Sequence, residues 1–281
     1  MYQEFYGFKE SPFNLLPDPD FLFMSSQYRQ ALSMLEYGLM KDGFTVITGE
    51  IGTGKTTLVR KLLERDDPRY TIGLLNNTVV YEKKELLKWI CFSFGLEYEG
   101  GSQVGLYELL TKFLIKEYRE GRQCVMIIDE AQKLNVDFLE QVRMISNLNF
   151  GKHLLIQFIL IGQPELRELI RRPELHQFAQ RISVDYHLKN LSEMDTHSYI
   201  MHRLTVSGGD PFLFDDEAKS LIWRASGGIP RMINVLADTA MVYGYAVEAP
   251  KITSEIVAQV ISDKEHSLSP VNENRKERTA N

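Results

Sequence analysis

Apolar residues along the first two thirds of the chain form short runs that are separated by segments with helical spacing. Apolar or alternating runs predict five strands, at residues 44–48, 70–75, 124–128, 154–161 and 182–188. Apolar residues spaced three and four apart predict helices at 25–43, 56–63, 86–94, 106–118, 136–148, 164–170 and 174–181. Strands that alternate with helices are the signature of a parallel sheet with helices on both faces. We therefore predict an α/β core.

The pattern changes at both ends of the chain. After about residue 190 the strands stop, and helices are predicted at 192–207, 215–226, 230–245 and 253–264. Residues 1–24 are rich in aromatics and prolines, and we expect an extended arm packed on the body, because exposing so many aromatic rings is unfavourable. The chain is thus divided into an arm (1–24), an α/β core (25–190), a helical lid (191–265) and a polar, disordered tail (266–281).

Composition and charge exclude several classes of protein. Apolar residues make up 44% of the chain and charged residues 25%, as in soluble globular proteins. A net charge of −6 disfavours a non-specific nucleic-acid binder, which needs a basic face. Cys91 and Cys124 lie far apart in apolar runs, so we expect buried free thiols in a reducing compartment. No signal peptide is recognisable, and no apolar run approaches the roughly 18 to 20 residues of a membrane span, so we expect a cytoplasmic protein whose membrane contacts are peripheral.

The strongest chemical signal is the run GEIGTGKT, which matches the P-loop pattern G-x-x-x-x-G-K-[ST] at every defined position. A predicted strand precedes it and a predicted helix follows it, as a phosphate-binding loop requires. Lys55 is expected to reach the β- and γ-phosphates of ATP, and the Thr56 hydroxyl to bind Mg²⁺. Before nucleotide binds, we expect Lys55 to be solvated. The predicted nucleotide cradle consists of Gly49, Glu50, Ile51, Gly52, Thr53, Gly54, Lys55, Thr56 and Thr57.

Acidic and amide side chains follow two further predicted strands. Asp129 and Glu130 come directly after the apolar run 125–128, at the strand end where ligands bind in open α/β sheets. Asp129 would hold Mg²⁺, as in a Walker B strand, and Glu130 would polarise a water for attack on the γ-phosphate. This adjacent glutamate favours hydrolysis over kinase chemistry. Gln163 follows the strand 154–161 and could orient that water, although an ordinary turn before Pro164 would explain it equally well.

Two arginines are candidates for neutralising charge on the transferred phosphoryl group. Arg181 ends a predicted helix just before the last strand, and Arg231 follows the loop Gly-Gly-Ile-Pro in the helical region. For any single arginine, a surface salt bridge is the more common role.

Together these motifs resemble an AAA+ ATPase, with a three-layer P-loop core and a C-terminal helical lid. The match is more specific than that superfamily, because several segments resemble the general secretion pathway protein A (ExeA-like) family. These are MYQEFYGF, SPFNLLPDPDFLFMS, ALSMLEYGL, GEIGTGKTTL, DEAQ, GQPEL, QRISVDYHL and GIPRMIN. The runs LLPDPDFLFMS and FAQRISVDYHL are similar to the branch that is encoded beside exosortase and exopolysaccharide loci.

The resemblance implies roles for particular residues. Gln163 stands at the sensor-1 position, and Arg231 stands at the sensor-2 position, from which the lid contacts the γ-phosphate. Arg181 is the first candidate for an arginine finger offered to the next subunit, with Arg171 and Arg172 as rivals. Asn77 is implied to tether Glu130 in an inactive state.

The resemblance also implies a function. We expect an oligomeric, Mg²⁺-dependent ATPase that forms a ring or a filament and serves an envelope secretion or exopolysaccharide export system. Longer family members carry a membrane helix and a periplasmic peptidoglycan-binding domain, neither of which is recognisable here, so we expect a protein partner at the inner membrane to supply that link. The alternative is an ATP-dependent oligomer on DNA of the transposition-regulator type, which the net charge disfavours.

Overall fold

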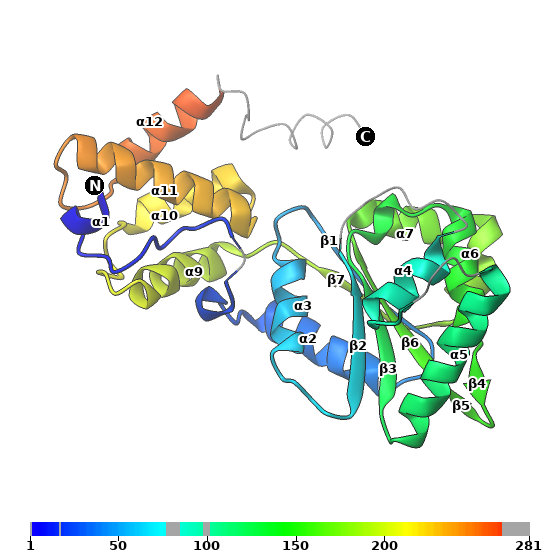
Figure 1. Ribbon diagram of the computed structural model, residues 1–281. Coiled ribbons are helices and arrows are strands. Elements are labelled where there is room, and N and C mark those ends of the chain that lie inside the picture. Colours follow the sequence, from blue (N-terminus) through cyan, green and yellow to red (C-terminus); the bar gives the residue numbers. More distant parts are fainter. Residues whose placement is uncertain (1, 17, 77–84, 98–101, 266–281) are drawn as a thin grey trace. The chain divides into compact units, whose positions relative to one another are not determined.

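A computed structural model describes residues 2–16, 18–76, 85–97 and 102–265 of the chain. The chain divides into two compact units (Figure 1). The first, which we call the sheet unit, comprises Arg29–Gly49 and Leu58–Leu188. The second, which we call the helical unit, comprises Met1–Tyr28, Glu50–Thr57 and Lys189–Asn281. The P-loop segment therefore groups with the C-terminal helices, although strand β1 of the sheet unit leads directly into it.

A five-stranded parallel sheet forms the centre of the sheet unit and confirms the predicted α/β core. Its strands are β1 (Phe44–Gly49), β2 (Tyr70–Leu75), β3 (Gln123–Ile128), β6 (Ile156–Gly162) and β7 (Ile182–Leu188). They lie in the order β2-β3-β6-β1-β7, and every neighbouring pair is parallel. All five carboxyl ends therefore reach the same edge of the sheet, which is where β1 continues into the P-loop.

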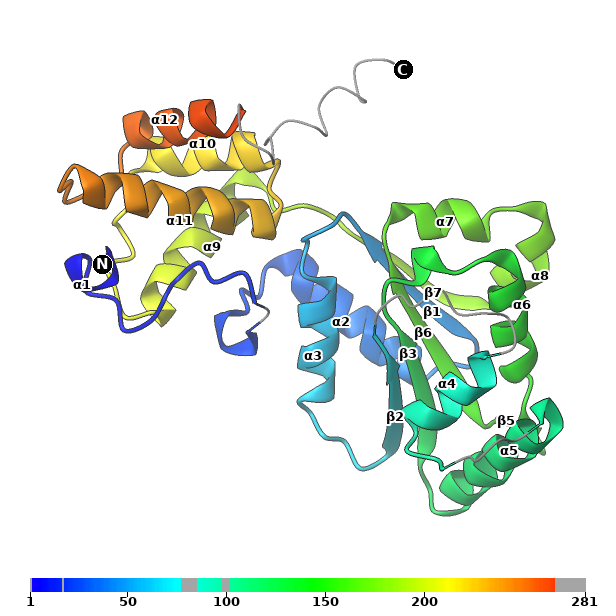
Figure 2. The same cartoon turned by 45° about the horizontal axis from the view of Figure 1, so that its top comes forward.

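Helices cover both faces of this sheet (Figure 2). One face carries α2 (Ser26–Leu39) and α3 (Lys55–Leu63), and the other carries α4 (Leu86–Ser93), α5 (Gln103–Arg119) and α6 (Val136–Ile145). Side chains of β3 alternate between the two faces, as in any strand. Cys124, Met126 and Ile128 join the core beneath α4, α5 and α6, whereas Val125 and Ile127 are buried on the opposite face. A strand buried on both faces explains the continuous apolar run in the sequence.

The structure corrects the sequence-based boundaries between α6 and β7. The helix expected over 136–148 ends at Ile145, and a hairpin of β4 (Asn149–Phe150) and β5 (His153–Leu154) follows it. The hairpin turns at Gly151, whose φ of 65° is freely available only to glycine. After α7 (Pro164–Ile170), the helix expected over 174–181 is a 3₁₀ turn, η3 (Pro173–Leu175), followed by the single turn α8 (His176–Ala179).

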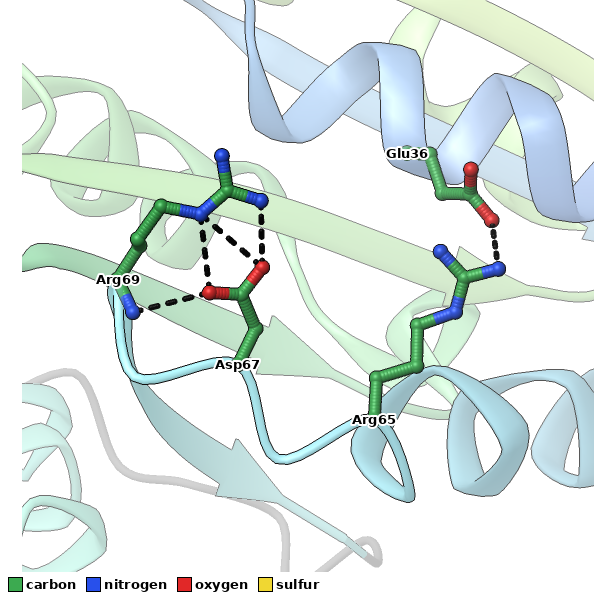
Figure 3. A network of polar contacts seen from close by, with 4 residues as sticks. All are labelled: Glu36, Arg65, Asp67 and Arg69. Carbon is green, nitrogen blue, oxygen red and sulfur yellow. Dashed lines mark hydrogen bonds and ion pairs between the residues drawn. The ribbon is translucent and has the colours of Figure 1, made fainter.

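Charged side chains organise the connection between α3 and β2 at the amino-terminal edge of the sheet (Figure 3). Arg65, just after α3, pairs with Glu36 of α2 at 2.5 Å. Arg69, just before β2, pairs with Asp67 at 2.6 Å and holds the pKa of that carboxyl at about 2. Both pairs are largely exposed, so each contributes little to the stability of the fold. Their main effect is to fix the conformation of the connecting segment.

Four helices and the N-terminal arm build the core of the helical unit. The helices are α9 (Glu193–Val206), α10 (Asp216–Ser226), α11 (Pro230–Ala246) and α12 (Ser254–Glu265). Phe8 and Phe13 of the arm are buried in their apolar core. The arm also contains two short helical turns that the sequence did not predict, α1 (Tyr2–Phe5) and η1 (Pro19–Phe21). The predicted tail, 266–281, lies outside the described residues.

Candidate functional site

The P-loop makes its turn between the end of β1 and the first residue of α3, Lys55. Gly52 and Gly54 have φ angles of 81° and 93°, in the left-handed region that only glycine enters without strain. The motif glycines are therefore required by the backbone of the turn. Backbone N–H groups at such a turn, together with the amino end of the following helix, form a site suited to phosphate.

Residues from two other segments of the helical unit hold this loop. The Tyr28 hydroxyl donates a hydrogen bond to the carbonyl oxygen of Gly54. The backbone N–H of Arg231, at the start of α11, donates to the carbonyl oxygen of Gly52 at 3.2 Å. A Cβ added at Gly52 would approach the Arg231 Cβ to 2.6 Å, so only glycine fits here. Tyr28 is buried, and burial raises the pKa of its phenol. Sequence reasoning missed this residue, and no pattern pointed to it.

Lys55 is buried inside the loop, so the expectation of a solvated lysine was wrong. Its side chain is only 6% exposed, and its Nζ donates to the carbonyl oxygen of Glu50 at 2.8 Å. The Thr53 hydroxyl donates to the same carbonyl oxygen at 2.9 Å. One oxygen atom thus anchors the ammonium group within the turn that is predicted to receive phosphate.

Asp129 and Glu130 follow β3 at the carboxyl edge of the sheet. Asp129 is 8% exposed, and its Oδ1 accepts a hydrogen bond from the N–H of Glu130 at 2.9 Å. Glu130 has a φ of 58°, a left-handed conformation that is uncommon outside glycine. Backbone strain of this kind concentrates at functional sites, where the surrounding structure maintains it.

Three side chains converge on Glu130 Oε2, and all belong to the sheet unit. Gln132 Nε2 donates to it at 3.0 Å, Gln163 Nε2 donates at 3.5 Å, and Lys133 pairs with it at 3.7 Å. Gln163 reaches this position because β6, which it follows, lies beside β3 in the sheet. The structure thus brings together two residues that the sequence singled out, Glu130 and Gln163. Gln132 was missed; its only signal was its place in the DEAQ segment.

Arg181 lies at the opposite edge of the sheet, just before β7, away from Glu130. Its Nη1 donates to the Ser146 hydroxyl at 2.9 Å and to the Asn147 side chain, and its guanidinium lies 5.9 Å from the ring centre of Phe44. Burial and the nearby charge of Arg143 lower the pKa of Arg181. Arg181 therefore does not join the carboxylates of its own chain.

The remaining predicted positions are less informative. Arg171 and Arg172 are exposed after α7, and Arg172 lines a cleft of about 660 Å³ together with Glu165 and Glu168. Asn77 lies outside the described residues.

Each of the two predicted Mg²⁺ ligands carries the type of donor atom that this ion prefers. Thr56 offers a hydroxyl oxygen and Asp129 offers carboxylate oxygens, and both are hard oxygen donors. Within the described residues no group of three or more His, Cys, Asp or Glu side chains could hold a metal ion.

Comparison with known proteins identifies the family of this chain. Residues 39–170 match the family model described as an AAA domain. The chain is 40% identical over 254 residues to General secretion pathway protein A of Aeromonas hydrophila; the alignment covers 90% of this chain and 46% of that protein. The chain thus spans about half the length of this relative. Across the described ranges, no helix combines the length and apolar character of a membrane span.

Solved structures share the fold at low sequence identity. The ORC1 protein of Aeropyrum pernix, solved in complex with DNA, superposes with a TM-score of 0.66 at 18% identity, covering 92% of this chain and 70% of that one. Cdc6p of Pyrobaculum aerophilum gives a TM-score of 0.65 at 14% identity, covering 93% and 70%. The chain therefore has an AAA+ α/β core followed by a C-terminal helical region, and it is a homologue of General secretion pathway protein A.

Proposed function

We propose that this protein is an ATPase that hydrolyses ATP in a Mg²⁺-dependent reaction. The observation that carries the proposal is the cluster at the carboxyl edge of the sheet, where Gln163 and Gln132 hold the carboxylate of Glu130. The P-loop leaves the sheet from the same edge, after β1. A phosphate-binding loop and an oriented carboxylate are the two parts that nucleotide hydrolysis needs.

Each residue has a distinct task in this proposal. Lys55 and the backbone of the P-loop bind the phosphates, and Thr56 and Asp129 hold Mg²⁺, which neutralises charge on the phosphate oxygens when bound. Glu130 accepts a proton from the attacking water, and Gln163 orients that water. Arg231 contacts the γ-phosphate from the helical region, as the sensor-2 position implies.

Calorimetric titration of ATP into Lys55→Ala tests nucleotide binding. We expect binding to be lost, because the ammonium group is the main positive charge in the loop. Lys55 is buried, so Lys55→Met serves as a second variant that preserves much of the side-chain volume, and thermal unfolding verifies that both variants fold. Lys61→Ala, at a partly exposed position of α3 where Lys61 pairs with Glu64, is the matched control and should bind like the parent. Parent-like affinity in folded Lys55→Met would reject the P-loop assignment.

We further propose that ATP turnover drives an envelope secretion or exopolysaccharide export system, in the branch associated with exosortase loci. The similarity to General secretion pathway protein A over 90% of the chain supports this role. The proposed working unit is a homo-oligomer, ring or filament, that binds a protein partner at the inner membrane. Affinity capture with the Glu130→Gln form and ATP tests this, because a form that binds but does not hydrolyse ATP should retain its partner. Recovery of transposition proteins instead of envelope proteins would refute the secretion role.

A further inference from the structure

One side chain, Gln132, connects the two halves of the predicted catalytic cluster. Its Nε2 donates to Glu130 Oε2 at 3.0 Å, and its Oε1 accepts a hydrogen bond from the backbone N–H of Gln163 at 3.0 Å. A primary amide carries a donor and an acceptor at opposite corners of one rigid plane. Gln132 therefore fixes the carboxylate at the end of β3 relative to the turn at the end of β6.

The backbone around Gln132 is built to keep it in this position. Glu130 adopts a left-handed conformation that leads into the 3₁₀ turn η2 (Ala131–Lys133), and Ala131, the first residue of that turn, is completely buried. The Lys133 N–H donates back to the Glu130 carbonyl oxygen at 3.0 Å and closes the turn. On the other side, a Cβ added at Gly162 would stand 3.0 Å from Gln132 Oε1 and 2.9 Å from Leu166 Cδ2. The glycine at the end of β6 thus leaves room for the amide.

We propose that Gln132 is a positioning residue for ATP hydrolysis. It fixes the carboxylate of Glu130 relative to the turn that begins at Gln163. The inference rests on the proposed ATPase function and assigns that site a residue beyond the P-loop, the acidic pair and Gln163. The physical reason is that a hydrogen bond from a neutral amide stabilises the ionised carboxylate and fixes its direction without removing its charge. Lys133 also pairs with Glu130, but its side chain is half-exposed and its Nζ lies 3.7 Å from Glu130 Oε2. It therefore fixes the direction of the carboxylate less than Gln132 does.

Steady-state and single-turnover hydrolysis by Gln132→Met provides the first test. Methionine has a similar length but can neither donate to Glu130 nor accept from Gln163. We expect kcat to fall roughly 10-fold or more, since a hydrogen bond to a charged group is lost, while the Kd for ATP stays within about 2-fold of the parent. Gln259→Ala, at an exposed position of α12, is the matched control and should leave both values unchanged.

The split between kcat and the Kd for ATP in Gln132→Glu separates positioning from a merely structural role. This variant keeps the size of the side chain, but its carboxylate can no longer donate a hydrogen bond to Glu130. We therefore expect kcat to fall at least as far as in Gln132→Met, while the Kd for ATP stays within about 2-fold of the parent. Gly162→Ala probes the same contact without touching a hydrogen-bonding atom, and we expect it to lower kcat by displacing the amide of Gln132.

Each outcome supports or overturns the inference. Unchanged kcat in folded Gln132→Met overturns it, as does a loss of ATP affinity as large as the loss of kcat, or an unchanged kcat in Gln132→Glu. If Gln132→Met does not fold, the result for Gln132→Glu decides whether the inference holds. Absence of hydrolysis by the parent protein overturns the proposed ATPase function together with this inference, whereas parent hydrolysis with an unaffected Gln132→Met overturns the inference alone.

Discussion

Glu130 illustrates, at the scale of single residues, how this fold prepares a carboxylate for chemistry. The residue occupies a left-handed conformation that costs on the order of 1 kcal/mol or more for a side chain other than glycine. Two amide groups and an ammonium group then converge on one of its oxygen atoms. The strain and the convergent contacts both indicate a side chain that is held in place for a task.

Replacement of Glu130 by glutamine should separate binding from hydrolysis. Glutamine keeps the shape of the side chain but cannot accept the proton, so we expect ATP affinity to be retained and turnover to fall about 100-fold or more. Calorimetry measures the first quantity and phosphate release the second. Glu174→Gln, at an exposed position of η3, is the matched control. Unchanged turnover in Glu130→Gln would mean that another group activates the water.

Among the elements, the N-terminal arm is bound by a buried arginine of α9, together with other hydrogen bonds such as that from Asn234 to Asn14. Arg203 is 5% exposed; its Nε donates to the carbonyl oxygen of Pro12 at 2.5 Å and its Nη2 to that of Asn14 at 3.1 Å. Its guanidinium also lies 4.4 Å from the ring centre of Phe21. An irregular segment satisfies few backbone groups by itself, so the guanidinium replaces the hydrogen bonds that a helix or sheet would provide.

Loss of that arginine should loosen the arm. In Arg203→Met the carbonyl oxygen of Pro12 loses its side-chain donor and that of Asn14 keeps only Asn234 Nδ2, at 3.2 Å, which should lower the free energy of unfolding by about 1–3 kcal/mol. Denaturant unfolding measures this change, and limited proteolysis within residues 9–25 should accelerate. Arg224→Met, at an exposed position of α10, should change neither measurement. Equal stability of Arg203→Met and the parent would show that the other contacts of the arm, such as the hydrogen bond from the Lys9 N–H to Ser207, hold it without Arg203.

For the whole molecule, the position of Arg181 bears on assembly. In the sheet unit it lies at the amino edge of the strands, opposite the edge that carries Glu130, and its guanidinium contacts the end of α6. If Arg181 serves hydrolysis, we expect it to act at the site of another copy, because it lies away from Glu130 of its own chain. A head-to-tail contact of this kind produces a ring or a filament.

Mixing two inactive variants tests this arrangement. Arg181→Ala should bind ATP normally but hydrolyse it roughly 1,000-fold more slowly, the scale of a lost arginine finger. Adding Lys55→Ala should restore part of the activity, because an intact P-loop on one chain then meets an intact Arg181 on the other. ATPase rate is measured against mixing ratio, and Arg231→Ala should show no rescue. Absence of rescue despite co-assembly would contradict the role of Arg181 in trans.

The alternative function, an ATP-dependent oligomer on DNA, can be judged from the net charge of the chain. A net charge of −6 disfavours contacts with the phosphate backbone, so we expect weak or no binding of duplex DNA at about 0.15 M salt. Electrophoretic mobility of a labelled duplex, with and without ATP, measures this, and any binding should weaken steeply as salt increases. A tight, ATP-dependent shift at that salt concentration would make the DNA-associated function the leading hypothesis.

Local patterns in the sequence determined the elements of this protein and the types of residue at its site. Strands buried on both faces, such as β3 and β6, appear as continuous apolar runs, whereas β7 at the edge of the sheet appears as an alternating run. These patterns are why the strands were predicted. The P-loop is recognisable because its turn requires glycine at Gly52 and Gly54, where φ is positive. Asp129 and Glu130 follow from their place at the end of a strand. The division into arm, core and lid, and the roles assigned to individual residues, remain predictions.

Only the tertiary structure decided how distant segments meet. The order β2-β3-β6-β1-β7 places β6 beside β3, and this brings Gln163 to Glu130, 33 residues earlier in the chain. The same is true of the hydrogen bond from Tyr28 to Gly54, which spans 26 residues, and of the burial of Lys55. The physical reason is that hydrophobic periodicity and turn chemistry act over a few residues, whereas these contacts depend on which strands pair and which surfaces pack together.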